Sequence, residues 1–255
     1  MIENVTAWNV VASLILVAIA LLAGLILELG VTRRLIVAVV RAAVQLLAVG
    51  LLFGWIATSG SAMLLAWVWV TAMVTITAVV ARRRAPELPG GGPVAGAAVA
   101  ATVAICLAVI FGLGILPYEP VSLIVIAGIT IGNSMPSQVL GANRVLAEVR
   151  DNRGQFEAML SLGLSKAQIV RLSGSQIVRT ALIPQIERTN VVGLIALPGA
   201  MTGLLLAGAD PVDAVLVQLI VMYLVLGAVA TSVIITVVAG IGAMFTPDLR
   251  LRTVD

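Results

Sequence analysis

Long apolar segments separated by short polar ones make up most of this chain. A membrane-spanning helix needs about 20 mostly apolar residues. Segments that reach or approach this length cover approximately residues 8–29, 35–56, 62–81, 94–116, 121–142, 191–207 and 212–243. The sixth is the weakest, because Pro198 and Gly199 interrupt it near its middle. The pattern predicts an all-α polytopic membrane protein with about seven transmembrane helices.

The composition supports the same fold class. Of the 255 residues, 61% are hydrophobic and 11% are charged, whereas soluble domains carry about 25% charged residues. A water-soluble fold could not cover so much apolar surface. We therefore expect residues 1–255 to form a single transmembrane domain.

The positions of the basic residues predict an orientation. Lys and Arg follow the first, third and fifth predicted spans and recur in the C-terminal tail, at Arg33, Arg34, Arg82, Arg83, Arg84, the segment 144–188, Arg250 and Arg252. The connections 58–61, 117–120 and 208–211 contain neither residue. The positive-inside rule then places the N-terminus outside and the C-terminus in the cytoplasm.

Residues 143–190 form the one long connection and should lie in the cytoplasm. Apolar residues recur there at helical spacing among charges, which predicts two amphipathic helices. Gly163 can end the first helix in the left-handed conformation, and Ser165 with Gln168 can cap the second. The pattern alone is equally typical of a helix that anchors to the membrane surface.

Short motifs in this connection resemble the EAA loop of ABC importer permeases. Glu157 and Ala158 precede Gly163, with Leu162 and Ser165 beside it. The resemblance implies that this helix pair is a coupling element that docks on a separate ATPase. Pro184 comes later than the closing proline usual in that family.

A broader set of motifs resembles the FetB (YbbM) family of permeases. The matching segments are 40–46, 126–128, 132–135, 160–163, 179–184, 197–204 and 207–211, in the same order and spacing. The resemblance implies the inner-membrane, multi-pass permease of a bacterial ABC exporter linked to iron and metal homeostasis, with plant relatives tied to aluminium tolerance. It also implies two ATPase copies, a second copy of this chain and surrounding lipids as partners, with no nucleic acid.

Two polar residues in the second predicted span are candidates for a substrate pathway. Arg41 lies about two turns into the span and Gln45 shares its helical face. An arginine at the centre of a membrane helix costs about 2.5–3.5 kcal/mol and is by default functional. Alternatively, Arg41 extends toward lipid phosphates at the membrane surface.

The fifth predicted span carries a second polar stripe. The stripe consists of Thr130, Asn133, Ser134, Ser137 and Gln138 and is interrupted by Met135 and Pro136. Met135 is also a candidate for the substrate pathway. Either these side chains line a substrate pathway or they form hydrogen bonds between helices. Pro136, Pro198 and Gly199 are candidate hinges, and Met201 beyond the Pro198 break joins the candidate pathway. If iron is carried, its ligands would be oxygen donors such as Asn133 and Gln138, helped by Met135 or Met201.

Missing motifs narrow the function. The sequence contains no phosphate loop for ATP, so a permease of this kind needs ATP and Mg²⁺ bound by its partner and has no cofactor or enzyme activity of its own. It has no histidine and one cysteine, Cys106, which argues against a resident metal site. The alternative function is a secondary transporter or channel driven by an ion gradient, but no acidic residue lies at mid-depth in a predicted span. A membrane enzyme would need a nucleophile and base that the sequence does not offer.

Overall fold

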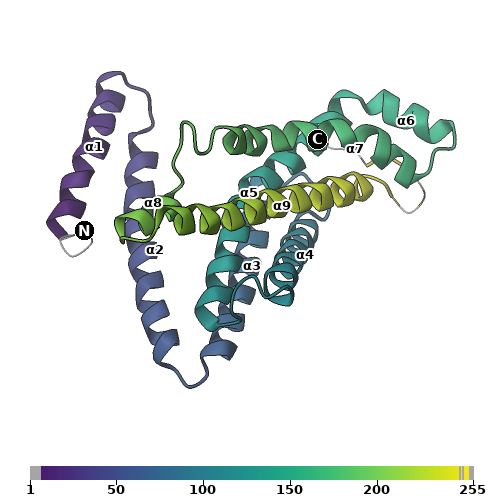
Figure 1. The fold of residues 1–255 in the computed structure, drawn as a ribbon. Coiled ribbons are helices and arrows are strands. Elements are labelled where there is room, and N and C mark those ends of the chain that lie inside the picture. Colours follow the sequence, from purple (N-terminus) through teal and green to yellow (C-terminus); the bar gives the residue numbers. More distant parts are fainter. Residues whose placement is uncertain (1–6, 247, 249, 253–255) are drawn as a thin grey trace.

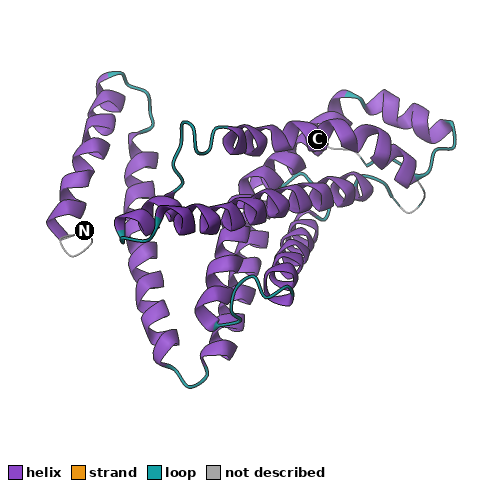
Figure 2. Cartoon of the chain, viewed as in Figure 1, coloured by secondary structure: helices purple, strands orange, loops and turns teal. Residues whose placement is uncertain are grey.

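The structure of the chain, a computed structural model, describes residues 7–246, 248 and 250–252. These residues fold into helices joined by loops (Figures 1 and 2). In chain order the helices are α1 Ala7–Ile26, α2 Thr32–Thr58, α3 Ala62–Arg84, α4 Gly91–Gly112, α5 Pro120–Asp151, α6 Arg153–Ser161, α7 Lys166–Asn190, α8 Gly199–Leu206 and α9 Pro211–Ala243. The predicted all-α class is confirmed for the described part of the chain.

Six of the described helices are long and apolar enough to cross a membrane, namely α1 to α5 and α9. They match six of the seven predicted spans to within a few residues at most ends. The prediction of a continuous span over residues 191–207 differs from the structure. Residues 191–198 form a linker there, and only α8 is helical. Its eight residues extend about 12 Å, too short for a hydrocarbon core of about 30 Å.

Helices α5 and α9 form the centre of the packed bundle and run in the same direction. Gly141 of α5 faces Val237 of α9, and one turn further Val145 faces Gly240. Helices α3, α4 and α7 pack around this pair. Helices α1 and α2 stand to one side, as Figure 1 shows, and most of their surface is exposed.

Helices α7 and α8 follow α9 in the opposite direction. The Nζ of Lys166, at the start of α7, donates to the carbonyl of Thr246 just past α9, at 3.3 Å. Gly174 then faces Val237 and Ile241. The backbone N–H of Met201 in α8 donates to the side chain of Gln218 near the start of α9. The α7–linker–α8 segment therefore accompanies almost the whole length of α9.

Candidate functional site

The α7–linker–α8 segment is a discontinuous helix beside a continuous one. Non-helical backbone is tolerated at membrane depth only where it is buried in protein or lines a cavity, because its polar groups need partners. Breaks of this kind are typical of substrate sites in transporters. The break in this chain does border a cavity.

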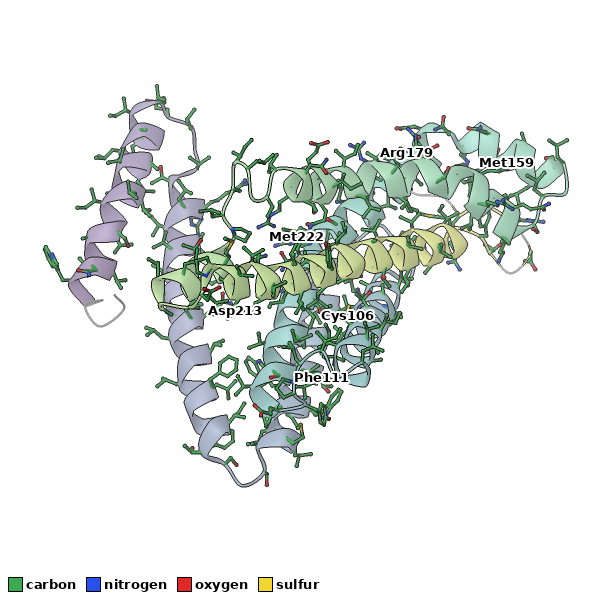
Figure 3. All side chains as sticks on the ribbon, in the orientation of Figure 1. Cys106, Phe111, Met159, Arg179, Asp213 and Met222 are labelled. Carbon is green, nitrogen blue, oxygen red and sulfur yellow. The ribbon has the colours of Figure 1, made fainter. Side chains whose placement is uncertain are left out.

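That cavity, the break pocket, has a volume of about 240 Å³ and lies among α5, α7, the linker, α8 and α9. Its polar lining side chains are Asn133, Gln185, Arg188 and Gln218, and Pro198, Gly199 and Ala200 contribute the break itself. The rest of the lining is apolar and includes Met222 of α9, which is labelled in Figure 3. Three segments distant in the sequence, namely α5, the α7–linker–α8 segment and α9, therefore meet at one pocket with polar side chains.

Two buried glutamines line the break pocket, and one of them, Gln218, joins two of its walls. Gln218 is 8% exposed, and its Oε1 accepts the N–H of Met201 in the first turn of α8, at 3.3 Å. Gln185 is 6% exposed, and its Nε2 donates to the Thr189 hydroxyl at 3.5 Å. Because α8 begins at this point, its first N–H groups lie next to the pocket, where a helix carries partial positive charge.

The polar side chains that line the break pocket are three amides and one cation. Arg188 supplies the charge, and the described lining contains no Asp, Glu, His or Cys. Within the described residues no cluster of three such side chains could hold a metal ion. The pocket therefore offers hydrogen bonds and positive charge, and only amide or backbone oxygens to a cation.

The structure brings some of the predicted pathway residues to this pocket. Asn133 lines it together with the two predicted hinge residues Pro198 and Gly199. Met201 is not among the lining residues, but its backbone N–H donates to Gln218, which is. The Nδ2 of Asn133 donates to the carbonyl of Ile129 at 2.8 Å, which holds the side chain along α5. Asn133 is therefore the stripe residue that meets the break at this pocket.

Other residues of the same stripe lie elsewhere. Ser134 is fully buried and bonds weakly to Ile131 at 3.4 Å, and Met135 and Pro136 are not part of the pocket lining. Gln138 is buried and donates to the carbonyl of Ala95 on α4 at 2.9 Å. Its Oε1 has no partner among the described residues and borders a void of about 10 Å³, which has room for about one water molecule. This placement favours the packing interpretation for Gln138.

Arg41 and Gln45 lie in a different place. Both are on α2 and line a separate cleft with Arg84 of α3. None of the described residues that line that cleft also lines the break pocket.

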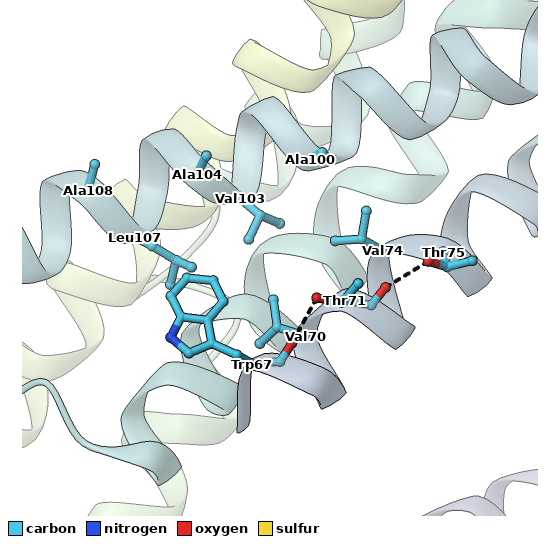
Figure 4. A pocket seen from close by; sticks show the side chains of 10 residues that line it. All are labelled: Trp67, Val70, Thr71, Val74, Thr75, Ala100, Val103, Ala104, Leu107 and Ala108. Carbon is cyan, nitrogen blue, oxygen red and sulfur yellow. Dashed lines mark hydrogen bonds between the residues drawn. The ribbon is translucent and has the colours of Figure 1, made fainter. Parts of the chain in front are cut away.

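A hollow between α3 and α4, shown in Figure 4, has a volume of about 520 Å³ and is larger than the break pocket. Its lining is apolar except for Thr71 and Thr75. Their hydroxyls donate to the carbonyls of Trp67 and Thr71, four residues earlier, both at 2.8 Å. Because these donors are satisfied within α3, the hollow offers apolar contact and little hydrogen bonding, as expected of a surface that faces lipid.

The predicted cytoplasmic helix pair corresponds to α6 and α7. Gly163 has φ +80°. The N–H of Gly163 donates to Leu160 and that of Leu164 to Met159, which completes a Schellman motif at the end of α6. Ser165 and Gln168 form the predicted capping box at the start of α7. Both local predictions are confirmed.

One face of α6 is buried and the other is open. Phe156 is fully buried, and its ring centroid lies 6.5 Å from that of Phe245 beyond α9. Glu157, Ala158 and Leu162 are exposed on the other side, Leu162 at 79%. We call these three residues with Gly163 the coupling tip, after the coupling element that the resemblance to the EAA loop led us to expect. A large apolar side chain is therefore presented at the end of a helix that is fixed to the bundle.

Sequence reasoning missed Gln185, Arg188 and Gln218. Gln218 was detectable, because a polar residue within the last apolar span is unusual. Gln185 and Arg188 were assigned to the cytoplasmic connection, and no local signal shows that this part of α7 lies beside Gln218. Their position follows from the antiparallel packing of α7 on α9.

Taken together, these features are those of a multi-pass α-helical inner-membrane protein with a polar pocket at a broken helix. The chain belongs to the uncharacterised protein family UPF0014, whose match covers residues 7–245. It is 33% identical to the UPF0014 membrane protein STAR2 of Oryza sativa over 244 residues, which are 95% of this chain and 85% of STAR2.

Two bacterial relatives are similarly close. The UPF0014 membrane protein YjkA of Bacillus subtilis is 31% identical over 240 residues, 94% of this chain and 96% of YjkA. The protein named "Probable iron export permease protein FetB" of Escherichia coli is 31% identical over 233 residues, 91% of this chain and 90% of FetB. No solved structure matches the chain.

Proposed function

We propose that this chain is the permease subunit of an ABC-type exporter, powered by a separate ATPase. The observation that carries the proposal is the coupling tip, where the exposed Leu162 projects from a capped helix that Phe156 fixes to the bundle core. A single exposed leucine is common on protein surfaces, so the weight of Leu162 comes from its place beside Glu157 and Gly163 in the segment that resembles the EAA loop. A groove of an ATPase is the partner that the likeness to the permease FetB supports.

The coupling tip is connected to the break pocket through two continuous helices. Helix α5 carries Asn133 at the pocket and ends at Asp151, next to α6. Helix α9 carries Gln218 at the pocket, and Phe245 beyond its end contacts Phe156. Movement of the tip can therefore reach the pocket through packed helices.

In the proposed topology, the α7–linker–α8 segment crosses the membrane as a seventh span. With six continuous crossings alone, both termini would lie on one side of the membrane. If the end of α7, the linker and α8 together cross it, the N-terminus lies outside and the C-terminus inside, as the distribution of arginines predicts. Residues 143–165 and the first part of α7 then lie in the cytoplasm.

The chain has no nucleotide site of its own in this proposal, and ATP and Mg²⁺ bind to the partner. Two copies of the permease and two of the ATPase form the complex, since two-fold pairing is the commonest closed assembly. The cargo is linked to iron or another metal through the likeness to FetB. The break pocket lacks carboxylates, so a bare metal cation would be held weakly by amide oxygens.

The decisive experiment is co-purification of the ATPase with a tagged Leu162→Glu variant. Desolvating an unpaired charge in a docking groove costs several kcal/mol, so ATPase recovery should fall at least about tenfold. Leu162 is exposed, so membrane insertion should not change. The matched control is Leu172→Glu, which introduces the same charge at an exposed leucine of α7 away from the tip, and there recovery should stay near wild type.

Recovery of the ATPase with Leu162→Glu at the wild-type yield would count against a coupling role. ATP hydrolysis by the purified chain alone, or full transport by a single permease copy without any ATPase, would contradict the proposal as a whole. The latter result would favour a secondary transporter.

A further inference from the structure

A second polar cleft lies between the first half of α2 and the end of α3. Its polar lining consists of Arg33, Arg34, Arg41 and Gln45 of α2 and Arg84 of α3, and its volume is about 830 Å³. We call it the arginine cleft. Since none of its described lining residues belongs to the break pocket, it is a separate site.

The arginine cleft gathers four positive charges without compensation from the described protein. No Asp or Glu is among its described lining residues. The ion pairs that the structure describes, Arg150 with Glu87 and Arg153 with Glu157, lie elsewhere. Guanidinium groups that line one cleft repel one another, and they are the side chains best suited to bind phosphate through paired hydrogen bonds. The cleft is therefore suited to an anion.

The surroundings of the cleft indicate where the anion comes from. Arg33 and Arg34 are in the first turn of α2 and Arg84 is the last residue of α3, so these three mark one edge of the apolar spans. Arg41 lies seven residues further along α2, about 10 Å deeper, and its long side chain can extend back toward the same edge. In the most apolar stretch of α2, 0% of the residues are buried in the protein. The rest of the described chain therefore leaves α2 uncovered, so lipid can reach the cleft along it.

We propose that the arginine cleft binds the headgroup of an anionic phospholipid. The phosphate lies among Arg33, Arg34, Arg41 and Arg84, Gln45 bonds to the glycerol region, and the acyl chains lie along the exposed apolar face of α2. The volume is within the range of about 300–1,000 Å³ typical of small-molecule sites. This assignment does not depend on the proposed transport function.

The test is lipid binding to the purified full-length chain in detergent, followed by native mass spectrometry with phosphatidylglycerol and phosphatidylcholine as probes. Phosphatidylglycerol should remain bound where phosphatidylcholine is lost. A basic residue near an anionic membrane surface contributes about 1 kcal/mol, so Arg84→Gln and Arg41→Gln should each weaken phosphatidylglycerol binding about fivefold. Arg41→Lys keeps the charge and should lose less.

Arg83→Gln is the matched control, because Arg83 is also exposed in the last turn of α3 but does not line the cleft. Binding by this variant should remain within about twofold of wild type. Each variant is compared by gel filtration, so that a folding defect is recognised.

Four results would overturn the assignment. Equal retention of phosphatidylcholine would remove the charge selectivity, and an equal loss in Arg83→Gln and Arg84→Gln would show a diffuse surface effect. Displacement of the lipid by inorganic phosphate at equal concentration would indicate a soluble anion as the natural ligand. A change of oligomeric state in the variants with unchanged lipid binding would indicate an interface between copies of the chain.

Discussion

Replacing Gly163 by alanine should loosen the coupling tip through backbone conformation alone. Gly163 has φ +80°, and no atom lies within 4 Å of the position that a Cβ would occupy. A clash with neighbours is therefore absent, and the cost is that of a left-handed L-residue, about 1–2 kcal/mol. The change acts directly on the turn closed by the hydrogen bonds of Gly163 to Leu160, at 2.9 Å, and of Leu164 to Met159, at 3.1 Å.

Hydrogen exchange of peptides that span residues 159–168 measures this effect. A cost of 1–2 kcal/mol raises the population of the opened turn by about 5–30-fold, so exchange should accelerate by that factor. The control is Gly154→Ala in the first turn of α6, where φ is not positive and the Cβ position is also free. Alanine favours a helix at that position, so exchange there should stay the same or slow. Unchanged exchange in Gly163→Ala would refute the reasoning.

Two further predictions address the pocket and the topology. Gln218→Leu removes the acceptor of the Met201 N–H. Leaving that group unpaired costs about 1–3 kcal/mol, so exchange at the start of α8 should accelerate about 5–150-fold. Gln176→Leu on the exposed face of α7 should have no effect there. A cysteine at Ser59 or Gly208 should react with a membrane-impermeant thiol reagent in intact cells and one at Arg153 should not, with little background because Cys106 is buried. Labelling at position 153 would overturn the orientation.

Features set by local chemistry could be predicted from the sequence. Helices α1 to α5 and α9 follow from hydropathy, because a run of apolar residues long enough to span the membrane has few other stable conformations. The turn at Gly163 and the cap at Ser165 depend on a few neighbouring residues, so their identity was sufficient. The break at Pro198 and Gly199 was visible for the same reason.

The composition of the break pocket could not be predicted in this way. It depends on α7 packing antiparallel to α9, which brings Gln185 and Arg188 beside Gln218, and no periodicity within α7 encodes that neighbour. Arg41 illustrates the same limit. The sequence correctly placed Arg41 and Gln45 on one face of α2. It could not show that this face borders a cleft with Arg84 of α3, whereas Asn133 of α5 lines a different pocket.

The position of Pro136 within α5 gives this helix a particular mechanical property. A proline inside a helix removes one backbone hydrogen bond and makes bending easier at that point. Asn133 lies on one side of Pro136, and the end of the helix at Asp151 lies on the other. The arm from Pro136 to Asp151 is about 22 Å long, so a displacement of about 4 Å at the Asp151 end corresponds to a bend of only about 10°. Under the proposed function, movement of the coupling tip by several ångströms would then need only a small change of angle in α5 beside Asn133.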